Sequence, residues 1–504
     1  MMDAIIGIGK KFPSVVAPVQ KLTFSEKIKW TLLILITYYI LGSITVWGID
    51  PSAVAQFEFL EIVFGSKFGS LITLGIGPIV TASIILQLLV GAKIIDWNLQ
   101  DPEDKAKYTS TQKVLGITFA IVEAIAYVMF GAIPPASGAA VVLVAVILQL
   151  AFGGILIMLM DEVVSKWGIG SGISLFIAAG VSKTIFLRIF SPPLGEAGGG
   201  IIAVFLGSLA QGQPSTAFIS LLPLISTIVV FSIVVFASSI RVEIPMAFAL
   251  PFGKFASRKW PLKFIYTSNI PVILTMAVLA NAKAAGKMLA DRGIEFLGTY
   301  DSQGQVVSGL LYYLTPPTSI GAVFVSVFAG VFAIIIGFAA HRFIKKYVLR
   351  MTFIGGLIGI VIAVLLLHAL ALPQMTTEEI GRALIYIIVL IIGSVVFAFF
   401  WTSTSGMDAH SISQQFKSSS IMIPGFRHDS RIVERVLQRY IPALTVLGGA
   451  FVGLLAGFAD LTSALGTGTG ILLTVMIVHQ MYEQIMQQHA DDLPEVVKRF
   501  IGGE

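Results

Sequence analysis

The sequence contains no cysteine and few charged residues, and both shortages exclude classes of protein. Without cysteine, the 504-residue chain forms neither disulfides nor thiolate metal sites. Asp, Glu, Lys and Arg make up 12% of the chain, whereas soluble globular proteins contain about 25% of these residues. The six histidines lack a metal-ligand spacing, and no P-loop or nucleophile motif is present. The composition therefore argues against a soluble domain and against a metalloenzyme.

Apolar runs are abundant instead, since 56% of the residues are hydrophobic. A transmembrane helix needs about 20 mostly apolar residues. Runs of roughly that length predict membrane spans at 30–49, 71–92, 114–133, 139–160, 172–189, 217–240, 268–287, 319–340, 351–371, 383–401, 440–459 and 468–484. The fold class is thus predicted to be an all-α polytopic membrane protein with about twelve spans. The even number of spans places both termini on one side.

The orientation follows from the basic residues. Lys and Arg concentrate in segments 10–29, 241–263, 342–350 and 417–439, which all lie on the same side in this topology. Because basic loops stay in the cytoplasm, both termini are predicted to be cytoplasmic. Residues 1–25 are basic and interrupted by two prolines, so they favour an amphipathic arm on the membrane surface over a cleavable signal peptide.

Two of these basic segments are longer than topology requires. The first contains Arg241, Lys254, Arg258, Lys259 and Lys263, and the second contains Arg427, Arg431, Arg435 and Arg439. The last three arginines recur every fourth residue and would form one stripe on a helix. Such stripes suit a polyanion, either anionic lipid or RNA. Alternatively, the basic residues of both segments only set the membrane topology.

The segment 50–70 differs from the other loops. Its apolar stretch is too short to span a membrane and contains Glu58 and Glu61. Short apolar stretches of this kind are often re-entrant or interfacial. An ordinary surface helix is the alternative.

Glycine-rich turns precede three of the spans, in "LGIGPIV" (74–80), "WGIGSGISLF" (167–176) and "LGTGTGILL" (465–473). Their spacing and context do not fit a dinucleotide-binding loop. Glycine permits broken helices that line a cavity, although close helix packing would also explain it. Aliphatic residues accompany each turn. At the first two turns they are four positions apart and so share a helix face: Ile76 with Val80, and Ile173 with Ile177. Leu473 follows the third turn. Converging aliphatic side chains would form a hydrophobic constriction.

Three polar residues lie inside spans: Thr81, Glu123 and Asn281. An ionisable residue in the membrane indicates a functional site. The three side chains could form one hydrogen-bonded cluster or act separately as contacts between helices. A proton-coupled transporter would also use an isolated Glu.

Several of these segments are similar to the SecY family of protein-translocase channels, in its archaeal form. The resemblance is carried in order by "LITLGIGPIVTASIILQLLVG", "DEVVSKWGIGSGISLFIAAGVS", "RVEIP", "FIYTSNIPVIL" and "GFRHDSRIVERVLQRYIPALTV…LGTGTGILLTVMIVHQMYEQ". It implies ten core helices in two pseudo-symmetric halves, 26–190 and 191–504. A pair of helices inserted at 319–371 departs from the family pattern.

The resemblance also implies roles for individual residues. The pore ring would consist of Ile76, Val80, Ile173, Ile177, Ile273 and Leu473. Thr81, Glu123 and Asn281 would be the polar cluster of a lateral gate, through which apolar segments leave into lipid. A plug at about 50–70 would close the pore through Phe57, Phe59, Leu60, Ile62, Val63 and Phe64.

The implied partners are ribosomes, small membrane subunits of the SecE and Sec-beta types, signal sequences and nascent chains, and membrane lipids. Ribosome contacts would be made by Arg241, Lys254, Arg258, Lys259, Arg427 and Arg431. The resemblance implies no catalytic residue, cofactor or metal, and a location in the plasma membrane. A secondary transporter is the alternative function, and an intramembrane enzyme would need paired acids or Ser and His inside the spans.

Overall fold

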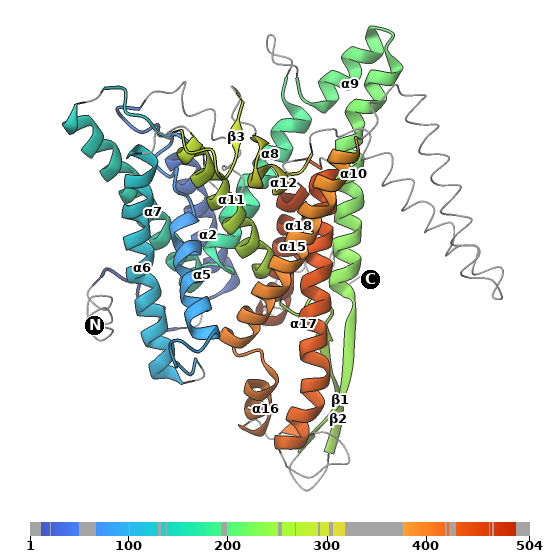
Figure 1. The fold of residues 1–504 in the computed structure, drawn as a ribbon. Coiled ribbons are helices and arrows are strands. Elements are labelled where there is room, and N and C mark those ends of the chain that lie inside the picture. The colour runs from blue at the N-terminus through green and yellow to red at the C-terminus, as the bar shows by residue number, and fades with distance from the viewer. Residues whose placement is uncertain are drawn as a thin grey trace, which may run out of the picture.

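A computed structural model describes residues 12–20, 22–49, 67–99, 101–129, 133–137, 139–192, 199–249, 255–267, 269–290, 293–301, 306–317, 376–418, 421–422, 430–462, 464–465 and 468–489. In this part of the chain the protein is predominantly helical, and long helices run side by side in one bundle (Figure 1). The predicted helical fold class is confirmed.

The first half of the bundle contains five helices: α2 (Phe24–Leu41), α5 (Gly77–Gly91), α6 (Pro102–Met129), α7 (Ala140–Trp167) and α8 (Gly172–Phe190). Helix α5 packs against α6, and α6 packs against α7. Helix α2 covers α7 and α8. Part of the predicted N-terminal arm lies on the end of α7, where Lys166 and Trp167 donate hydrogen bonds to the carbonyls of Val15 and Val16.

The second half contains α9 (Ile201–Ala210), α10 (Pro214–Ser239), α11 (Ile270–Ala290), α15 (Thr377–Thr404), α17 (Ser430–Leu461) and α18 (Gly468–His489). Helix α15 packs against both α11 and α17, and α18 packs against α10 and α17. The short helix α9 was not predicted from the sequence.

Apart from the contact of α8 with α9, the next helix in the chain, the two halves meet along two different sets of helices. In one contact α8 packs against α18, and in the other α5 packs against α11 and α15. We call the second contact the seam. Helices from both halves thus surround the middle of the bundle.

Two small sheets and two short helices complete the described part. Strands β1 (Arg241–Ala249) and β2 (Phe255–Lys263) form an antiparallel hairpin that projects from one end of the bundle (Figure 1). Strand β5 (Ile421–Met422) pairs with β1, and α16 (Ala409–Ser418) lies between α15 and β5 in the sequence. Strands β3 (Thr299–Tyr300) and β4 (Val306–Ser308) and helix α12 (Leu310–Tyr313) lie at the opposite end. We refer to the two ends as the hairpin end and the far end.

Helix boundaries differ from the predicted spans where polar sequence continues a helix beyond the apolar run. Helix α6 begins at Pro102 instead of residue 114, and Lys107 pairs with Glu103 and Asp104 in its first turns. Helix α17 begins at Ser430, ten residues before its predicted span. Helix α2 begins early because Thr23 and Glu26 form a capping box, and it ends before Gly42.

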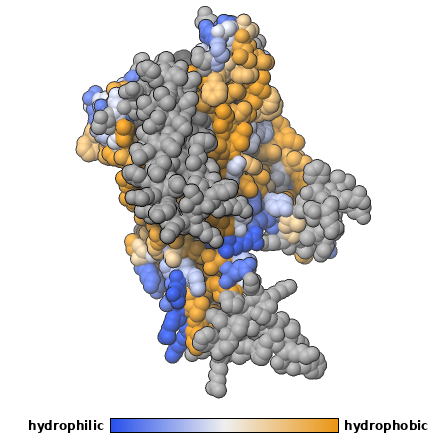
Figure 2. Space-filling model, turned by 90° about the vertical axis from the view of Figure 1, so that its right-hand side faces the viewer, coloured by the Kyte–Doolittle hydropathy of each residue, from blue (hydrophilic) through white to orange (hydrophobic). Residues whose placement is uncertain are grey.

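Seven of the described helices or helical stretches are long and apolar enough to cross a membrane: α6, α7, α8, α10, α11, α17 and the stretch Glu378–Phe416, which contains nearly all of α15 and most of α16. Helices α2, α5 and α18 lie in the same bundle, so the described helices match the ten predicted core spans. Large apolar side chains such as Leu148, Phe236 and Ile392 are exposed, and Figure 2 shows hydrophobic side chains over much of one described face. An apolar surface of this extent suits contact with lipid. The inserted pair at 319–371 lies outside the described residues.

Candidate functional site

The six residues predicted to form a pore ring belong to one large apolar core. They come from four helices or their first turns: Ile76 and Val80 at α5, Ile173 and Ile177 on α8, Ile273 on α11, and Leu473 on α18. Five of them are buried, and Ile173 packs partly buried against the same core. This apolar core therefore contains aliphatic side chains from both halves of the bundle.

A cavity of about 600 Å³ adjoins this core. Val80, Ile173 and Ile273 line it together with residues near the hairpin end, including Thr404 and Gln480. Its wall is mixed, because polar side chains stand beside the aliphatic ones, namely Ser83, Gln87, Gln112 and Asn269. The cavity thus reaches the aliphatic core from the hairpin side with a lining that tolerates water.

The three polar residues predicted inside spans form one hydrogen-bonded group, the polar cluster. Asn281 Nδ2 donates to Thr81 Oγ1 at 3.3 Å, and Thr81 Oγ1 donates to Glu123 Oε1 at 3.1 Å. Thr81 lies on α5, Glu123 on α6 and Asn281 on α11. Because α11 belongs to the other half, the bond from Asn281 crosses the seam. The cluster therefore joins the two halves by polar contacts, away from the contact of α8 with α18.

Sequence reasoning missed two carboxylates that lie beside the glycine turns. Asp161 near the end of α7 accepts a hydrogen bond from the Ile173 backbone at 2.9 Å, and Asp460 near the end of α17 accepts one from the Thr469 backbone at 2.9 Å. Both residues satisfy the first turn of the next helix, where backbone N–H groups have no partner within the helix. The available signal was an acidic residue shortly before a glycine turn in each half of the sequence.

The geometry at the second turn explains why its glycines are needed. Gly170 has a φ of +78°, a conformation that favours glycine. A Cβ on Gly172 would lie 2.5 Å from the Cα of Asp161. The turn therefore lets α8 begin in direct contact with α7.

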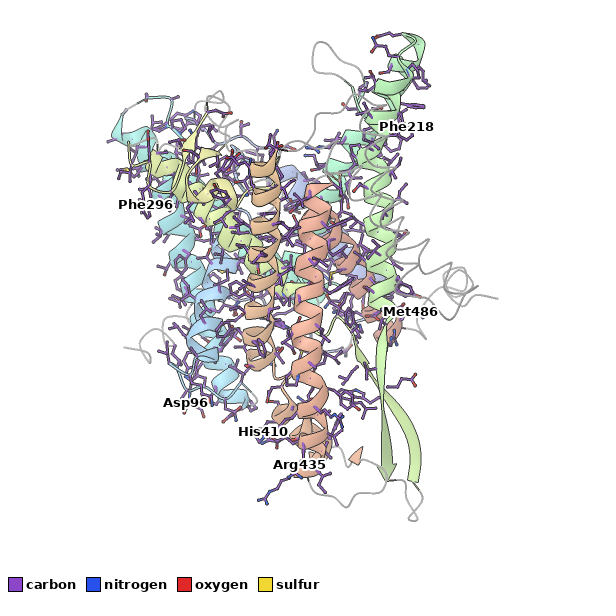
Figure 3. The ribbon with its side chains drawn as sticks, turned by 45° about the vertical axis from the view of Figure 1, so that its right-hand side comes forward. Asp96, Phe218, Phe296, His410, Arg435 and Met486 are labelled. Carbon is purple, nitrogen blue, oxygen red and sulfur yellow. The ribbon has the colours of Figure 1, made fainter. Side chains whose placement is uncertain are left out.

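The two basic segments predicted from the sequence lie together at the hairpin end. The β1–β2 hairpin carries the first, and β5 brings part of the second against β1 through the pairs Ala247 with Met422 and Phe248 with Ile421. The arginine stripe is helical, as predicted, since its three residues lie exposed on α17: Arg431, Arg435 and Arg439. Figure 3 shows Arg435 at the same end as the hairpin.

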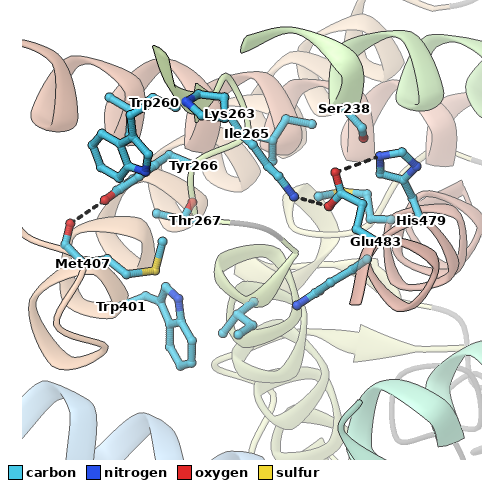
Figure 4. A pocket seen from close by; sticks show the side chains of 15 residues that line it. Ser238, Trp260, Lys263, Ile265, Tyr266, Thr267, Trp401, Met407, His479 and Glu483 are labelled. Atoms are coloured by element: carbon cyan, nitrogen blue, oxygen red, sulfur yellow. Dashed lines mark hydrogen bonds and ion pairs between the residues drawn. The ribbon is translucent and has the colours of Figure 1, made fainter. Parts of the chain in front are cut away.

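The base of the hairpin is fixed to α18 by ion pairs. Arg241 and Lys263 face each other in the strand register, and both pair with Glu483. His479 lies one turn earlier on α18, 3.7 Å from the same carboxylate (Figure 4).

Lys263, His479 and Glu483 border a cavity of about 330 Å³ at the hairpin end. Its other walls include Trp260, Trp401 and Met407. Burial raises the pKa of Tyr266, another lining residue, whose hydroxyl donates to the Met407 carbonyl at 2.7 Å. The Tyr266 hydroxyl therefore stays protonated and connects the segment after β2 to the turn between α15 and α16.

Other predicted residues cannot be placed in this way. The plug residues between Phe57 and Phe64, and Lys254 and Arg427 of the basic segments, lie outside the described residues. Arg258 and Lys259 lie in β2, where the backbone pairs with β1.

Comparison with known proteins gives consistent matches. The SecY family model matches residues 70–482. The protein translocase subunit SecY of Methanocaldococcus jannaschii is 41% identical over 503 residues, which cover 99% of this chain and 100% of that protein. A solved structure of a protein conducting channel shares 40% identity with a TM-score of 0.76, covering 97% of this chain and 98% of the other. The Sec61 chain in the canine ribosome-channel complex from the endoplasmic reticulum has a TM-score of 0.73 at 40% identity, with the same coverage.

Proposed function

The chain belongs to the SecY family of protein-translocase channel subunits, and from this we propose how its own residues conduct, seal and release a polypeptide. It is a multi-pass membrane protein and a channel subunit, not an enzyme. The observation that carries the proposal is the convergence of six aliphatic residues from four helices of both halves on one core.

These six residues act as the pore ring. In the idle state their side chains close the passage, and aliphatic groups offer no polar atom to replace the hydration shell of an ion. A passing polypeptide separates them, because aliphatic side chains can move between staggered rotamers. The adjoining cavity receives the chain from the hairpin side, and its mixed lining accepts polar as well as apolar segments.

The seam acts as the lateral gate, and the polar cluster holds it closed. Hydrogen bonds between membrane helices contribute about 0.6 kcal/mol each on average, so the one bond of the cluster that crosses the seam, from Asn281 to Thr81, can be broken at small cost. An emerging apolar segment gains about 0.8 kcal/mol for each CH₂ group that it transfers into lipid. A sufficiently apolar segment therefore leaves sideways, whereas a polar segment continues through the pore.

The remaining parts are assigned by family. Residues 50–70, with Phe57 to Phe64, act as a plug on the external side of the ring. The halves 26–190 and 191–504 move relative to each other at the seam, and the helix pair at 319–371 lies beside it in the sequence. Both termini are cytoplasmic and the protein resides in the plasma membrane, with SecE-type and Sec-beta-type subunits as membrane partners.

The hairpin end faces the cytoplasm and docks the ribosome. The exposed arginines of α17 and the basic residues of the hairpin lie at the same end of the bundle. A basic surface of this kind binds RNA through its phosphates. Signal sequences would then reach the cavity directly from the docked ribosome.

The test is photocrosslinking from a probe at Ile173 to a radiolabelled, ribosome-stalled secretory chain in membrane vesicles. We expect a strong adduct that is absent with a cytosolic chain and lost after the chain is released. Phe186, exposed on the same helix, is the matched control position and should give little adduct. Absence of adducts from positions 173, 76 and 473 alike would refute the pore assignment.

A further inference from the structure

Two helices that carry ring residues begin in the same way, with a carboxylate from the preceding helix on their first turn. Asp161 Oδ1 accepts the N–H of Ile173, which lies 12 positions later at the start of α8. Asp460 Oδ1 accepts the N–H of Thr469 at 2.9 Å and its hydroxyl at 3.1 Å, nine positions later at the start of α18. The turn of the second half is thus shorter, but the bond to the backbone is the same.

The two turns also correspond in sequence. When Ile173 is aligned with Thr469, Gly172 falls on Gly468 and Ile177 falls on Leu473. The last pair consists of two predicted ring residues, each one helical turn after the backbone group that donates to the carboxylate. The carboxylate is therefore a shared feature of the α7–α8 and α17–α18 connections.

The third glycine turn, before α5, is built differently. A proline stands within the first two positions of α5. Proline has no backbone N–H, so it removes one of the donors that a helix start must otherwise satisfy. At two of the three glycine turns, a carboxylate from the preceding helix thus accepts a backbone N–H at the helix start. At the turn before α5, proline instead reduces the number of backbone N–H groups that need an acceptor.

This arrangement fixes the first turn of α8 and of α18. The N–H groups there have no partner within the helix, and inside a membrane water does not compensate for a missing bond. A negative carboxylate is also favoured at the positive end of a helix dipole. Ile173 is at once the bonded residue and a ring residue, so its position depends directly on Asp161.

Neighbouring contacts further restrict the positions of Asp161 and Asp460. The close approach of Gly172 to the Cα of Asp161 leaves no room for a side chain on the glycine. Asp460 Oδ2 accepts a further hydrogen bond, from the Tyr386 hydroxyl of α15 at 2.7 Å. Helices α8 and α18 in turn pack against each other, so the two anchored starts belong to one contact between the halves.

We infer that Asp161 and Asp460 are positioning residues of the closed channel, each holding the start of a pore helix so that Ile177 and Leu473 meet in the sealed ring. The inference rests on the proposed function, because it assumes that this core is the seal. In this role each aspartate acts through a side-chain oxygen that accepts a hydrogen bond from a backbone N–H.

The test is an ion-leak assay on the idle full-length chain in proteoliposomes that contain an iodide-quenched dye. Asp161→Ala should raise the rate of iodide entry about fivefold to tenfold, as expected for the loss of one ordinary hydrogen bond to the backbone. Asp161→Asn keeps an oxygen acceptor and should stay within about twofold of wild type. Glu162→Gln is the matched control, because the neighbouring Glu162 pairs with Lys113 of α6 and Lys166 of α7. It should leave the leak unchanged.

Two results would overturn the inference. One is a wild-type leak in a folded Asp161→Ala protein, with folding judged by the thermal unfolding midpoint. The other is an equal leak in Asp161→Asn and Asp161→Ala, which would show that the charge matters and not the acceptor. If Asp161→Ala does not fold, the same pair of substitutions at Asp460 decides by the same criteria.

The outcome is independent of the polypeptide path. No translocating chain is present in the leak assay, and the crosslinking experiment uses the wild-type aspartates. An adduct at position 173 together with no leak in the alanine variants refutes only the positioning role. A leak that depends on the acceptor, together with no adduct, refutes only the polypeptide path.

Discussion

Arg241, the first residue of β1, is ion-paired with Glu483 near the end of α18, at 3.4 Å between Nη2 and Oε1. Lys263, the last residue of β2, pairs with the same carboxylate. One acidic residue thus closes the base of the hairpin and fixes it to the helix that carries Leu473. The exposed side chains of Arg241 and Lys263 contrast with the largely buried one of Glu483.

Replacing Glu483 should loosen this connection. Glu483→Gln is expected to lower the free energy of unfolding by about 1–2 kcal/mol, since two partly exposed ion pairs are lost. Thermal unfolding of Glu483→Gln, Arg241→Gln and the double variant forms a double-mutant cycle. The loss in the double variant should be smaller than the sum of the single losses. Strict additivity would show that the pair does not interact.

Breaking the polar cluster should make the seam easier to open. Thr81→Val removes both hydrogen bonds, of which only the one from Asn281 crosses the seam, and is expected to shift the closed–open balance by about 0.6 kcal/mol toward open. The measurement is membrane insertion of a marginally apolar reporter segment, which should increase about threefold. Thr118→Val is the control, because the Thr118 hydroxyl donates to the Val114 carbonyl of its own helix. An equal effect of both substitutions would contradict a role of the seam.

Packing of α7 against the chain before α5 depends on Gly153. A Cβ there would lie 1.7 Å from the Leu71 carbonyl oxygen. Gly153→Ala should therefore lower the free energy of unfolding by about 3 kcal/mol. A Cβ added to Gly207, inside α9, would have nothing within 4 Å, and Gly207→Ala should raise stability by about 0.5–1 kcal/mol. Thermal unfolding in detergent checks both, and a stable Gly153→Ala variant would disprove the close approach.

Ribosome binding should depend on salt through the stripe on α17. Arg435→Gln and Arg439→Gln each remove one exposed charge, and each is expected to reduce the slope of log affinity against log salt by about one unit if the residue contacts a phosphate. Arg188→Gln, at an exposed arginine on α8, is the matched control. Slopes measured by co-sedimentation with ribosomes would be unchanged if the stripe faces another partner.

Much of the fold could be predicted because hydropathy determines where a helix crosses lipid. The spans at 139–160 and 172–189 correspond closely to α7 and α8, except that α7 continues to Trp167. The hydrogen-bonded arrangement of Thr81, Glu123 and Asn281 agrees with the expected cluster, since polar groups in lipid favour one another. The gate role of this cluster stays a prediction.

What could not be predicted depends on contacts between distant residues. The β1–β2 hairpin has no clear alternation of polar and apolar residues, and its pairing with β5 joins segments that are far apart in the sequence. Asp161 and Asp460 were missed because each accepts a backbone N–H at the start of the next helix, and an acidic residue before a glycine turn does not by itself show that contact. The glycine pattern marked the turns but did not show what the helix starts bind.

The pairing of β5 with β1 has a consequence for the strength of docking. Two basic segments without a contact between them would each lose conformational freedom on binding, and each would bind weakly. Because β5 connects the second segment to β1, the two segments would bind a large polyanion as a bivalent ligand, so that binding of one segment raises the effective concentration of the other. Two backbone-paired residues without charge, Ile421 and Met422, would thus contribute to the avidity of the surface that we propose for ribosome docking.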